Sequence, residues 1–295
     1  MDPSATAWHD WYNAEIYAAY VDEYPIYSEL NRITADLAEL EAARRVLDLA
    51  CGTGATARAC LPLLPRDAEL VGVDGAEAMV GVARAQVGDP RCRFRVAAAA
   101  AVDRAVEGLF DRAVCNTAFW QFPAVRPVLE AVARVLEPGA IFVFNVPAEL
   151  VVGEMTPIHP FQAALARVVE RERGAAFAPG QTPIDGERLR AWLDAAGLEW
   201  IDRRRHVYHG RQRELTELMR IPAMIGPLTP DLDPATRQRL IDRAAARVDP
   251  EAPVEVPWIY FRARRRASTT LRSIVPRSVK IPSGRSKTDQ SKSRP

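Results

Sequence analysis

The stretch that decides the fold is "RRVLDLACGTGATARAC", residues 44–60. It places an apolar run before Gly52 and Gly54 and an alanine-rich segment after them. A strand that leads into such a glycine pair and then into a helix forms a tight turn, where backbone N–H groups are exposed and no Cβ blocks a ligand. The segment therefore predicts a ligand that lies against the main chain at the carboxyl end of a buried strand.

The surrounding sequence, from Val46 to Val146, alternates short apolar runs with alanine-rich helical stretches. Helices are expected after Gly54, over residues 76–86 and over residues 125–136, where Pro138-Gly139 marks the stop. The candidate strands are "RVLDLA", "ELVGVD", "RFRVA", "FDRAVCN" and "AIFVFNV". This alternation is typical of a parallel sheet with crossover helices, so a doubly wound α/β core is predicted.

Four regions follow from the pattern on either side of this core. Residues 1–40 are aromatic and then helical, and are expected to form a lid over the core at residues 41–147. Residues 148–265 mix helices and strands and are interpreted as a helical cap, inserted before the closing strand "VEVPWIYFRA" of the same domain. Residues 266–295 are basic and poor in core-forming residues, and are expected to be disordered.

The glycine motif alone leaves two ligand classes open. "GTGATA" also satisfies the dinucleotide pattern G-x-G-x-x-A, and Asp74 follows at the end of the next strand. Asp48, a carboxylate on the first strand, suits a zwitterionic ligand with an ammonium group and would repel a pyrophosphate. Asp74 serves either ligand, because a carboxylate accepts hydrogen bonds from ribose hydroxyls.

Several segments resemble class I S-adenosylmethionine-dependent methyltransferases. "VLDLACGTG" is similar to their first motif, and "LVGVDGAEAMV" to their second-strand segment with its ribose-binding acid. "FDRAVCNTAFWQFP" and "VARVLEPGAIFVFNV" resemble their fourth and fifth strands. The resemblance covers roughly residues 15–147 and implies a Rossmann-like, seven-stranded mixed sheet, S-adenosylmethionine as cofactor and methyl transfer as the reaction.

The resemblance also implies roles for individual residues. Gly52 and Gly54 would admit the methionine part of the cofactor, and Asp48 would support its ammonium group or order the loop. Asp74 would bind the ribose, while Ala76 and Met79 would line the adenine. The cofactor-binding set expected from the resemblance is Tyr20, Asp48, Ala50, Gly52, Gly54, Asp74, Gly75, Met79, Ala98, Ala99 and Asn116.

One departure from the family concerns the adenine. Many relatives have an acidic residue after the third strand, whereas this chain reads "FRVAAAAAVD", with Ala98 at that position. Packing and backbone contacts around Ala98 and Ala99 are therefore expected to hold the adenine. If the alignment shifts, Asp103 would be the acid, although it also fits a solvated loop.

Aromatic residues dominate the lid and suggest where it meets the ligand. Residues 8–27 contain two Trp and five Tyr, and aromatic faces favour a cation such as a sulfonium. In relatives, a tyrosine of an A-x-x-Y helix often approaches the cofactor, and Tyr20 is the best match. Packing of this segment in the core is the alternative.

The segment after the fourth strand, "NTAFWQF", is expected at the mouth from which the methyl group emerges. Some relatives carry a histidine there, but this chain has Trp120 and Gln121. The expected substrate-binding set is Tyr17, Phe119, Trp120 and Gln121, although Phe119 and Trp120 fit core packing equally well. No general base is assigned, since a sulfonium is already an activated leaving group and positioning provides much of the acceleration. The weak catalytic candidates are His9, Tyr12 and His159, while His206 and His209 fit a surface or sheet better.

Composition limits the partners and the compartment. Four cysteines lack metal-type spacing, and the N-terminus lacks a secretory pattern, so a reduced, cytoplasmic protein without a metal is expected. No apolar run approaches the roughly 18 residues of a membrane span. Residues 1–261 contain nine more acids than bases, which argues against a nucleic-acid partner for the folded part. Assembly into a homo-oligomer is left open.

The leading hypothesis is a methyltransferase that acts on a small-molecule acceptor, for example in secondary metabolism. A nicotinamide-dependent oxidoreductase is one alternative, permitted by the glycine pattern and Asp74. A protein that binds S-adenosylmethionine but has a non-methyltransfer, cyclase-like activity is the other. The apolar cap is expected to form the acceptor pocket and holds Met155, Phe161, Phe177, Trp192, Met219, Met224 and Ile225.

Overall fold

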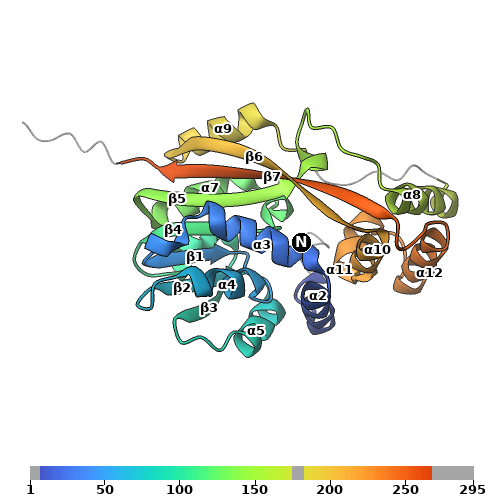
Figure 1. Ribbon diagram of the computed structural model, residues 1–295, viewed down its shortest axis with the longest axis horizontal. Coiled ribbons are helices and arrows are strands. Elements are labelled where there is room, and N and C mark those ends of the chain that lie inside the picture. The colour runs from blue at the N-terminus through green and yellow to red at the C-terminus, as the bar shows by residue number, and fades with distance from the viewer. Residues whose placement is uncertain (1–6, 175–182, 268–295) are drawn as a thin grey trace, which may run out of the picture.

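A seven-stranded sheet forms the centre of the molecule (Figure 1). The computed structural model describes residues 7–174 and 183–267. The strand order is β3-β2-β1-β4-β5-β7-β6; the first five strands are parallel, and β7 runs antiparallel to both β5 and β6. The strands are β1 (Arg45–Leu49), β2 (Glu69–Asp74), β3 (Cys92–Val96), β4 (Phe110–Cys115), β5 (Leu136–Pro147), β6 (Leu198–Arg211) and β7 (Pro253–Arg265). The predicted doubly wound, mixed seven-stranded fold is confirmed.

The central strands are almost entirely apolar because helices cover both of their faces. β1 lies between β2 and β4, and Asp48 pairs in register with Gly72 on one side and Val114 on the other. The chain order reverses between β1 and β4, which is the position where open α/β sheets bind ligands at the carboxyl ends of their strands. The carboxylate of β1 therefore sits directly beneath the expected site.

Two groups of helices cover the sheet, each with its own apolar cluster. One face carries α3 (Pro25–Leu37), α4 (Ala55–Cys60) and α5 (Glu77–Gln86). The other carries α6 (Val102–Ala105), α7 (Val125–Val135) and α9 (Gly186–Ala195). The helix predicted over residues 125–136 agrees with α7, but Pro138-Gly139, the expected stop, lies within β5, which begins at Leu136. The 3₁₀ helices are η1 (Leu40–Ala42), η2 (Leu61–Leu63), η3 (Ala99–Ala101), η4 (Phe119–Gln121), η5 (Ala148–Leu150) and η6 (Gly226–Leu228).

The segment predicted as a lid forms α2 (Trp11–Glu23) and α3. The Asp10 side chain caps α2 by accepting a hydrogen bond from the Tyr12 amide at 2.8 Å. Small residues of α2 pack against α5. The ring of His206 on β6 contacts the carboxylate of Glu29 on α3, with 2.5 Å between Nε2 and Oε1. The lid helices are thus docked on both the core and the long β6 strand.

The helices of the predicted cap region lie in two places, before and after β6. Between β5 and β6 lie η5, α8 (Pro160–Arg173) and α9; between β6 and β7 lie α10 (Gln212–Arg220), α11 (Pro222–Ile225), η6 and α12 (Pro234–Ala245). Figure 1 shows α8, α10 and α12 gathered at one end of the β6–β7 pair. These three helices share an apolar cluster that contains Phe161 and Leu240, while α9 packs on the sheet.

The apolar residues predicted to line one acceptor pocket in the cap therefore lie in different parts of the structure. Phe161 and Ile225 are buried in the cluster of α8, α10 and α12, and Met219 packs against it. Met155 is 89% exposed. Phe177 and the predicted basic tail, beyond its first two residues, lie outside the described residues. In the two described ranges, the helices are all too short or too polar to cross a membrane.

Candidate functional site

A cavity of about 1150 Å³ opens at the carboxyl edge of the sheet. Loops that follow β1, β2, β3 and β4 form its floor, and residues of the lid, of α9 and of η6 form its walls. It therefore lies at the point where the strand order reverses, as the fold predicts. Predicted residues that line it are His9, Tyr17, Ala50, Gly52, Asp74, Gly75, Met79, Ala98, Ala99, Asn116, Trp120 and Gln121.

The two glycines of the loop after β1 differ in their surroundings and therefore in their roles. Both adopt left-handed backbone, with φ +51° at Gly52 and +84° at Gly54, which favours glycine. Gly52 lines the cavity, and a Cβ there would lie 3.9 Å from Tyr17 Cε1. Gly54 lies outside the cavity lining, and a Cβ there would approach Val87 Cγ2 to 2.8 Å. Gly54 therefore does not face the cavity as predicted; its lack of a Cβ allows the loop to pass close to Ala83, Val87 and Phe94.

Asp74 holds the ligand-facing loops together. Its carboxylate accepts hydrogen bonds from the amides of Gly52 and Ala76, each at 2.9 Å. Burial raises the pKa of Asp74, while these two amides and the nearby His9 lower it again in part. An ionised carboxylate has about four lone-pair sites, so acceptor capacity remains for the hydroxyls of a ligand.

Asp48 is fully buried beneath the glycine loop, outside the cavity lining. Neither of its carboxylate oxygens has a hydrogen-bond partner among the described residues, and the same holds for the buried Thr53 hydroxyl. Burial first, and then the charge of Asp74, raise the pKa of Asp48 well above its usual range; the Ala57 amide offsets only part of this rise. An unpaired buried carboxylate is costly, so a ligand cation above the loop would be favoured. The polar groups present thus fit an ammonium-bearing ligand and disfavour a pyrophosphate.

The wall expected to hold adenine is apolar. Met79, Ala98 and Ala99 line the cavity there. Asp103, the alternative acid, instead forms an ion pair with Arg134, with 2.7 Å between Oδ2 and Nε, outside the cavity lining. The aligned Ala98 position is therefore the one that faces the cavity, and the alternative assignment to Asp103 is wrong.

Of the two lid tyrosines predicted at the site, Tyr17 and Tyr20, the structure places Tyr17 there. Tyr20 is buried outside the cavity lining, and its hydroxyl donates to the backbone oxygen of Glu214 at 3.0 Å. Tyr17, three residues earlier, lines the cavity, and its ring packs edge-on against that of Tyr27, with 5.5 Å between the centroids. Burial raises the pKa of Tyr17 to about 12, so its hydroxyl is neutral at pH 7. Tyr20 anchors the lid to the cap and is removed from the cofactor set.

The segment after β4 forms η4 and also divides into core and cavity residues. Phe119 is fully buried and stacks on Phe144, with 4.0 Å between ring centroids. Its predicted contact with substrate is therefore wrong. Trp120 and Gln121 line the cavity, and the Gln121 side chain accepts a hydrogen bond from Trp8 Nε1 at 3.0 Å.

The network of buried amide side chains beneath η4 was not predicted from the sequence, although Asn116 was expected at the site. Thr117 has a left-handed backbone with φ +53°, which costs about 1–2 kcal/mol for a residue with a Cβ. Its amide donates to Asn145 Oδ1 at 2.6 Å, which helps to hold this conformation. Asn31 on α3 joins the same network through Asn116, which follows β4. Polar residues at the ends of two buried strands, "CNT" and "FNV", were the available signal.

The far wall of the cavity comes from α9, α11 and η6. Trp192, Met224 and Leu228 line it, and the Arg188 guanidinium lies 5.8 Å from the centroid of the Trp192 ring. Trp192 and Met224 were expected in an acceptor pocket, but the other contributors to this wall were missed. Five prolines also line the cavity: Pro123, Pro127, Pro183, Pro227 and Pro230.

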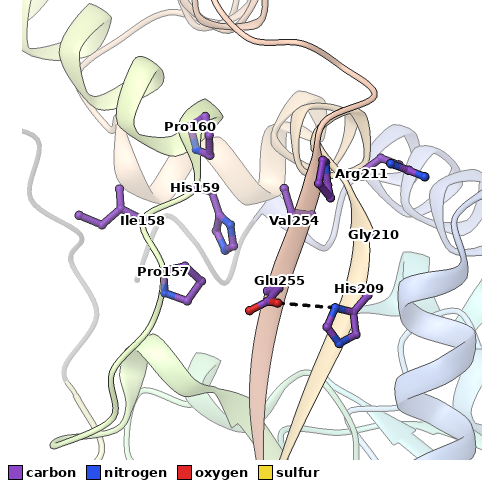
Figure 2. Close-up of a pocket in the computed structure, with 10 residues that line it drawn as sticks. Pro157, Ile158, His159, Pro160, His209, Gly210, Arg211, Val254 and Glu255 are labelled. Carbon is purple, nitrogen blue, oxygen red and sulfur yellow. Dashed lines mark ion pairs between the residues drawn. The ribbon is translucent and has the colours of Figure 1, made fainter.

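Two of the three weak catalytic candidates lie elsewhere. Tyr12 is 64% exposed and lies outside the lining of the large cavity. His159 is buried and lines a separate cavity of about 480 Å³, shown in Figure 2, where His209 Nδ1 lies 3.9 Å from Glu255 Oε1. Burial lowers the pKa of His159. Among the described residues, His9 is the histidine that lines the large cavity, and no cluster of three or more His, Cys, Asp or Glu suits a metal ion.

Comparison with known proteins gives a family for this geometry. Residues 46–139 match the family model described as a methyltransferase domain. The chain is similar to Trans-aconitate 2-methyltransferase of Methylobacterium radiotolerans, with 29% identity over 253 residues, 81% of this chain and 89% of that protein. It is also similar to Ubiquinone biosynthesis O-methyltransferase of Hahella chejuensis, with 27% identity over 216 residues, 70% of this chain and 83% of that protein.

A solved structure supports the fold. The YcgJ protein from Bacillus subtilis matches with a TM-score of 0.55 and 21% identity, over 81% of this chain and 99% of that chain. The glycine loop and Asp74 agree with these matches, and the unpaired Asp48 carboxylate argues against the nicotinamide-dependent alternative. The chain is therefore a class I S-adenosylmethionine-dependent methyltransferase, with S-adenosylmethionine as its cofactor.

Proposed function

We propose that the chain methylates a small molecule with a largely apolar body, bound beside the cofactor in the large cavity. The observation that carries this proposal is the continuity of the cavity, which extends from the glycine loop to the wall formed by α9 and η6. Its volume of about 1150 Å³ exceeds the roughly 300–1,000 Å³ typical of a pocket for one small ligand. One ligand at the loop thus leaves room for a second.

In this proposal the loop residues hold the cofactor. The main chain at Gly52 lies against its amino-acid part, Asp74 accepts hydrogen bonds from the ribose, and Met79 with Ala98 packs on the adenine. When bound, S-adenosylmethionine supplies a methyl group on a positively charged sulfur. The aromatic side chain of Tyr17 provides a face that favours a cation and excludes water.

The acceptor is proposed to lie between η4 and the α9–η6 wall. Trp120, Trp192, Met224 and the wall prolines supply apolar area, and Gln121 supplies a polar contact. The names of both curated relatives refer to small molecules, trans-aconitate and ubiquinone precursors, which supports an acceptor of this size. A role in secondary metabolism is part of the proposal by analogy of fold and cavity.

Catalysis in this proposal depends on positioning. The site holds the methyl donor and the nucleophile in line, near contact and away from water. Because their translational freedom is already lost on binding, the reaction step itself is much faster. No residue is assigned as general base.

The excess of acids in residues 1–261 supports a small molecule over a nucleic acid as acceptor, and the free cysteines of the described chain support a reduced, cytoplasmic location.

Isothermal titration calorimetry tests the donor, with S-adenosylhomocysteine and NADH as probes. Binding of S-adenosylhomocysteine in the micromolar range is expected; binding of NADH alone would overturn the proposal.

Incubation with methyl-labelled S-adenosylmethionine and a cell extract then tests the acceptor. Label should appear in the small-molecule fraction with release of S-adenosylhomocysteine, whereas label in protein or RNA would contradict a small acceptor. Turnover of an extract compound without release of S-adenosylhomocysteine would favour the cyclase-like alternative.

A further inference from the structure

The Asn31 side chain on α3 is held in one orientation at the floor of the large cavity. The residue is 3% exposed and lines that cavity. Its Oδ1 accepts two hydrogen bonds, from Thr56 Oγ1 at 2.7 Å and from Asn116 Nδ2 at 2.6 Å. Asn116 Nδ2 can only donate, so a flipped Asn31 amide would lose this bond, whereas the Thr56 hydroxyl can donate or accept. The network therefore determines which end of the amide is oxygen and which is nitrogen.

Asn31 ends a chain of amides that all point the same way. The Thr117 amide donates to Asn145 Oδ1, and Asn145 Nδ2 donates to Asn116 Oδ1, each at 2.6 Å. Asn116 then donates to Asn31, and Thr34 Oγ1 adds a second donor to Asn116 Oδ1 at 2.8 Å. Hydrogen bonds in such a series polarise one another in a low-dielectric interior. The series strengthens the donor at its end, which is Asn31 Nδ2.

This terminal donor has no hydrogen-bond partner in the part of the chain that the structure describes. Nδ2 of Asn31 makes no hydrogen bond to any described residue, although the side chain is almost completely buried. Buried polar groups in folded proteins are nearly always paired with protein, water or ligand. An amide fixed in orientation and unpaired at a cavity wall is suited to bind the acceptor atom of a ligand.

The position of Asn31 identifies that atom. Thr56, which holds Asn31, is the second residue of α4 and follows the glycine loop directly. The two arginines of the cavity, Arg126 and Arg188, come from α7 and α9 on the acceptor side. We propose that Asn31 Nδ2 donates a hydrogen bond to the carboxylate of the amino-acid part of S-adenosylmethionine, with Thr56 and Asn116 as positioning residues. This inference rests on the proposed function, because that proposal puts the cofactor at the loop.

Calorimetry with two probes tests the inference. S-adenosylmethionine carries the carboxylate, whereas decarboxylated S-adenosylmethionine lacks it and keeps the ammonium and sulfonium groups. The variant Asn31→Asp retains an oxygen for Thr56 and Asn116 but replaces the free donor by an acceptor. Affinity for S-adenosylmethionine should fall by about 30-fold, the size expected for a lost hydrogen bond to a charged group. Affinity for the decarboxylated probe should change by less than about threefold or improve.

A pair of isosteric variants supplies the control. Thr56→Val removes a donor that orients Asn31 and should reduce the preference for the carboxylate-bearing probe by about 3- to 10-fold. Thr216→Val removes a buried hydroxyl on α10 that bonds the Gln212 backbone, outside both the network and the cavity lining, and should leave that preference within about twofold. Thr56→Val also carries the test if Asn31→Asp does not fold.

The outcomes separate this inference from the proposed function. If the wild-type protein binds neither probe, both fail. If it binds both probes and the variants Asn31→Asp and Thr56→Val leave the preference unchanged, or weaken the two probes equally, the cofactor site stands and the role of Asn31 is overturned.

Discussion

The two halves of the large cavity are built in different ways. The loop half is lined by residues from three segments, 50–56 without Gly54, 74–79 and 97–99, which lie within fifty positions of one another and contribute mainly backbone and small side chains. The rim half consists of residues 120–127, 183–192 and 223–230, which come from three distant segments and contribute aromatic, proline and aliphatic side chains. Recognition by backbone depends on a short segment of chain, whereas recognition by side chains changes with single substitutions. This difference supports the proposal that the cofactor binds at the loop half and that the rim half selects the acceptor.

The largest effect on cofactor affinity is expected from Asp74→Ala, which changes the loop half of the cavity. The change leaves the Gly52 and Ala76 amides without their shared acceptor and removes the proposed ribose contact. Affinity for S-adenosylhomocysteine, measured by calorimetry, should fall at least about 100-fold, since each lost hydrogen bond to a charged group is worth about 1.5–3 kcal/mol. The control is Asp103→Ala, which removes an acid outside the cavity lining; its affinity for S-adenosylhomocysteine should stay within about twofold of wild type. Unchanged affinity in Asp74→Ala would mean that the cofactor binds elsewhere.

Asp48→Asn should weaken binding and stabilise the free protein. Burial raises the pKa of Asp48 in the folded state, so the folded protein holds this proton more tightly than the unfolded chain. Its contribution to stability therefore falls as pH rises above the ordinary carboxyl pKa of about 4. Removing the charge should stabilise the free protein at pH 7 by about 1–3 kcal/mol and much less at pH 4. Thermal melts of both proteins at the two pH values measure this.

The same variant should bind S-adenosylhomocysteine about tenfold more weakly, because the ammonium group loses a nearby negative charge. Calorimetry at pH 7 gives the comparison with wild type. Equal affinity together with higher stability would show that Asp48 does not contribute to the loop half.

Trp192→Ala tests the rim half. The side chain lines the acceptor wall, so KM for an acceptor found in the extract screen should rise about tenfold through lost apolar contact. Affinity for S-adenosylhomocysteine should change by less than about twofold. Trp200→Ala is the matched control, since Trp200 packs on Phe261 outside the cavity lining. A loss of S-adenosylhomocysteine affinity in Trp192→Ala would contradict the division of the cavity.

The smallest effect is expected from deletion of residues 268–295. Every residue that lines the large cavity precedes position 231, so both halves should be intact. Calorimetry with S-adenosylhomocysteine and methyl transfer to the extract acceptor should each match the full-length chain. A large loss of either would show that the basic tail takes part in the site.

Much of the core was predictable because its signals are local. Each predicted strand from Arg45 to Val146 coincides with a strand of the sheet, since a run of Val, Leu and Ile bounded by turn residues has few alternatives. The cap was predicted less well. α9 and α8 both carry helical periodicity, yet one packs on the sheet and the other forms a separate cluster with α10 and α12. Periodicity reports that a helix has an apolar face, but not which partner covers it.

The residues of the site also fall into those that local sequence predicted and those that tertiary packing placed. The chain's own order of residues determined where the glycine loop, Asp48 and Asp74 would meet, because the carboxyl ends of adjacent parallel strands lie at one edge of a sheet. Tertiary packing decided that Tyr17 rather than Tyr20 faces the cavity and that Asn31 presents a free donor there. These outcomes depend on contacts between segments far apart in the chain, such as Tyr20 with Glu214 and Asn31 with Asn116, and short-range spacing carries no information about such contacts.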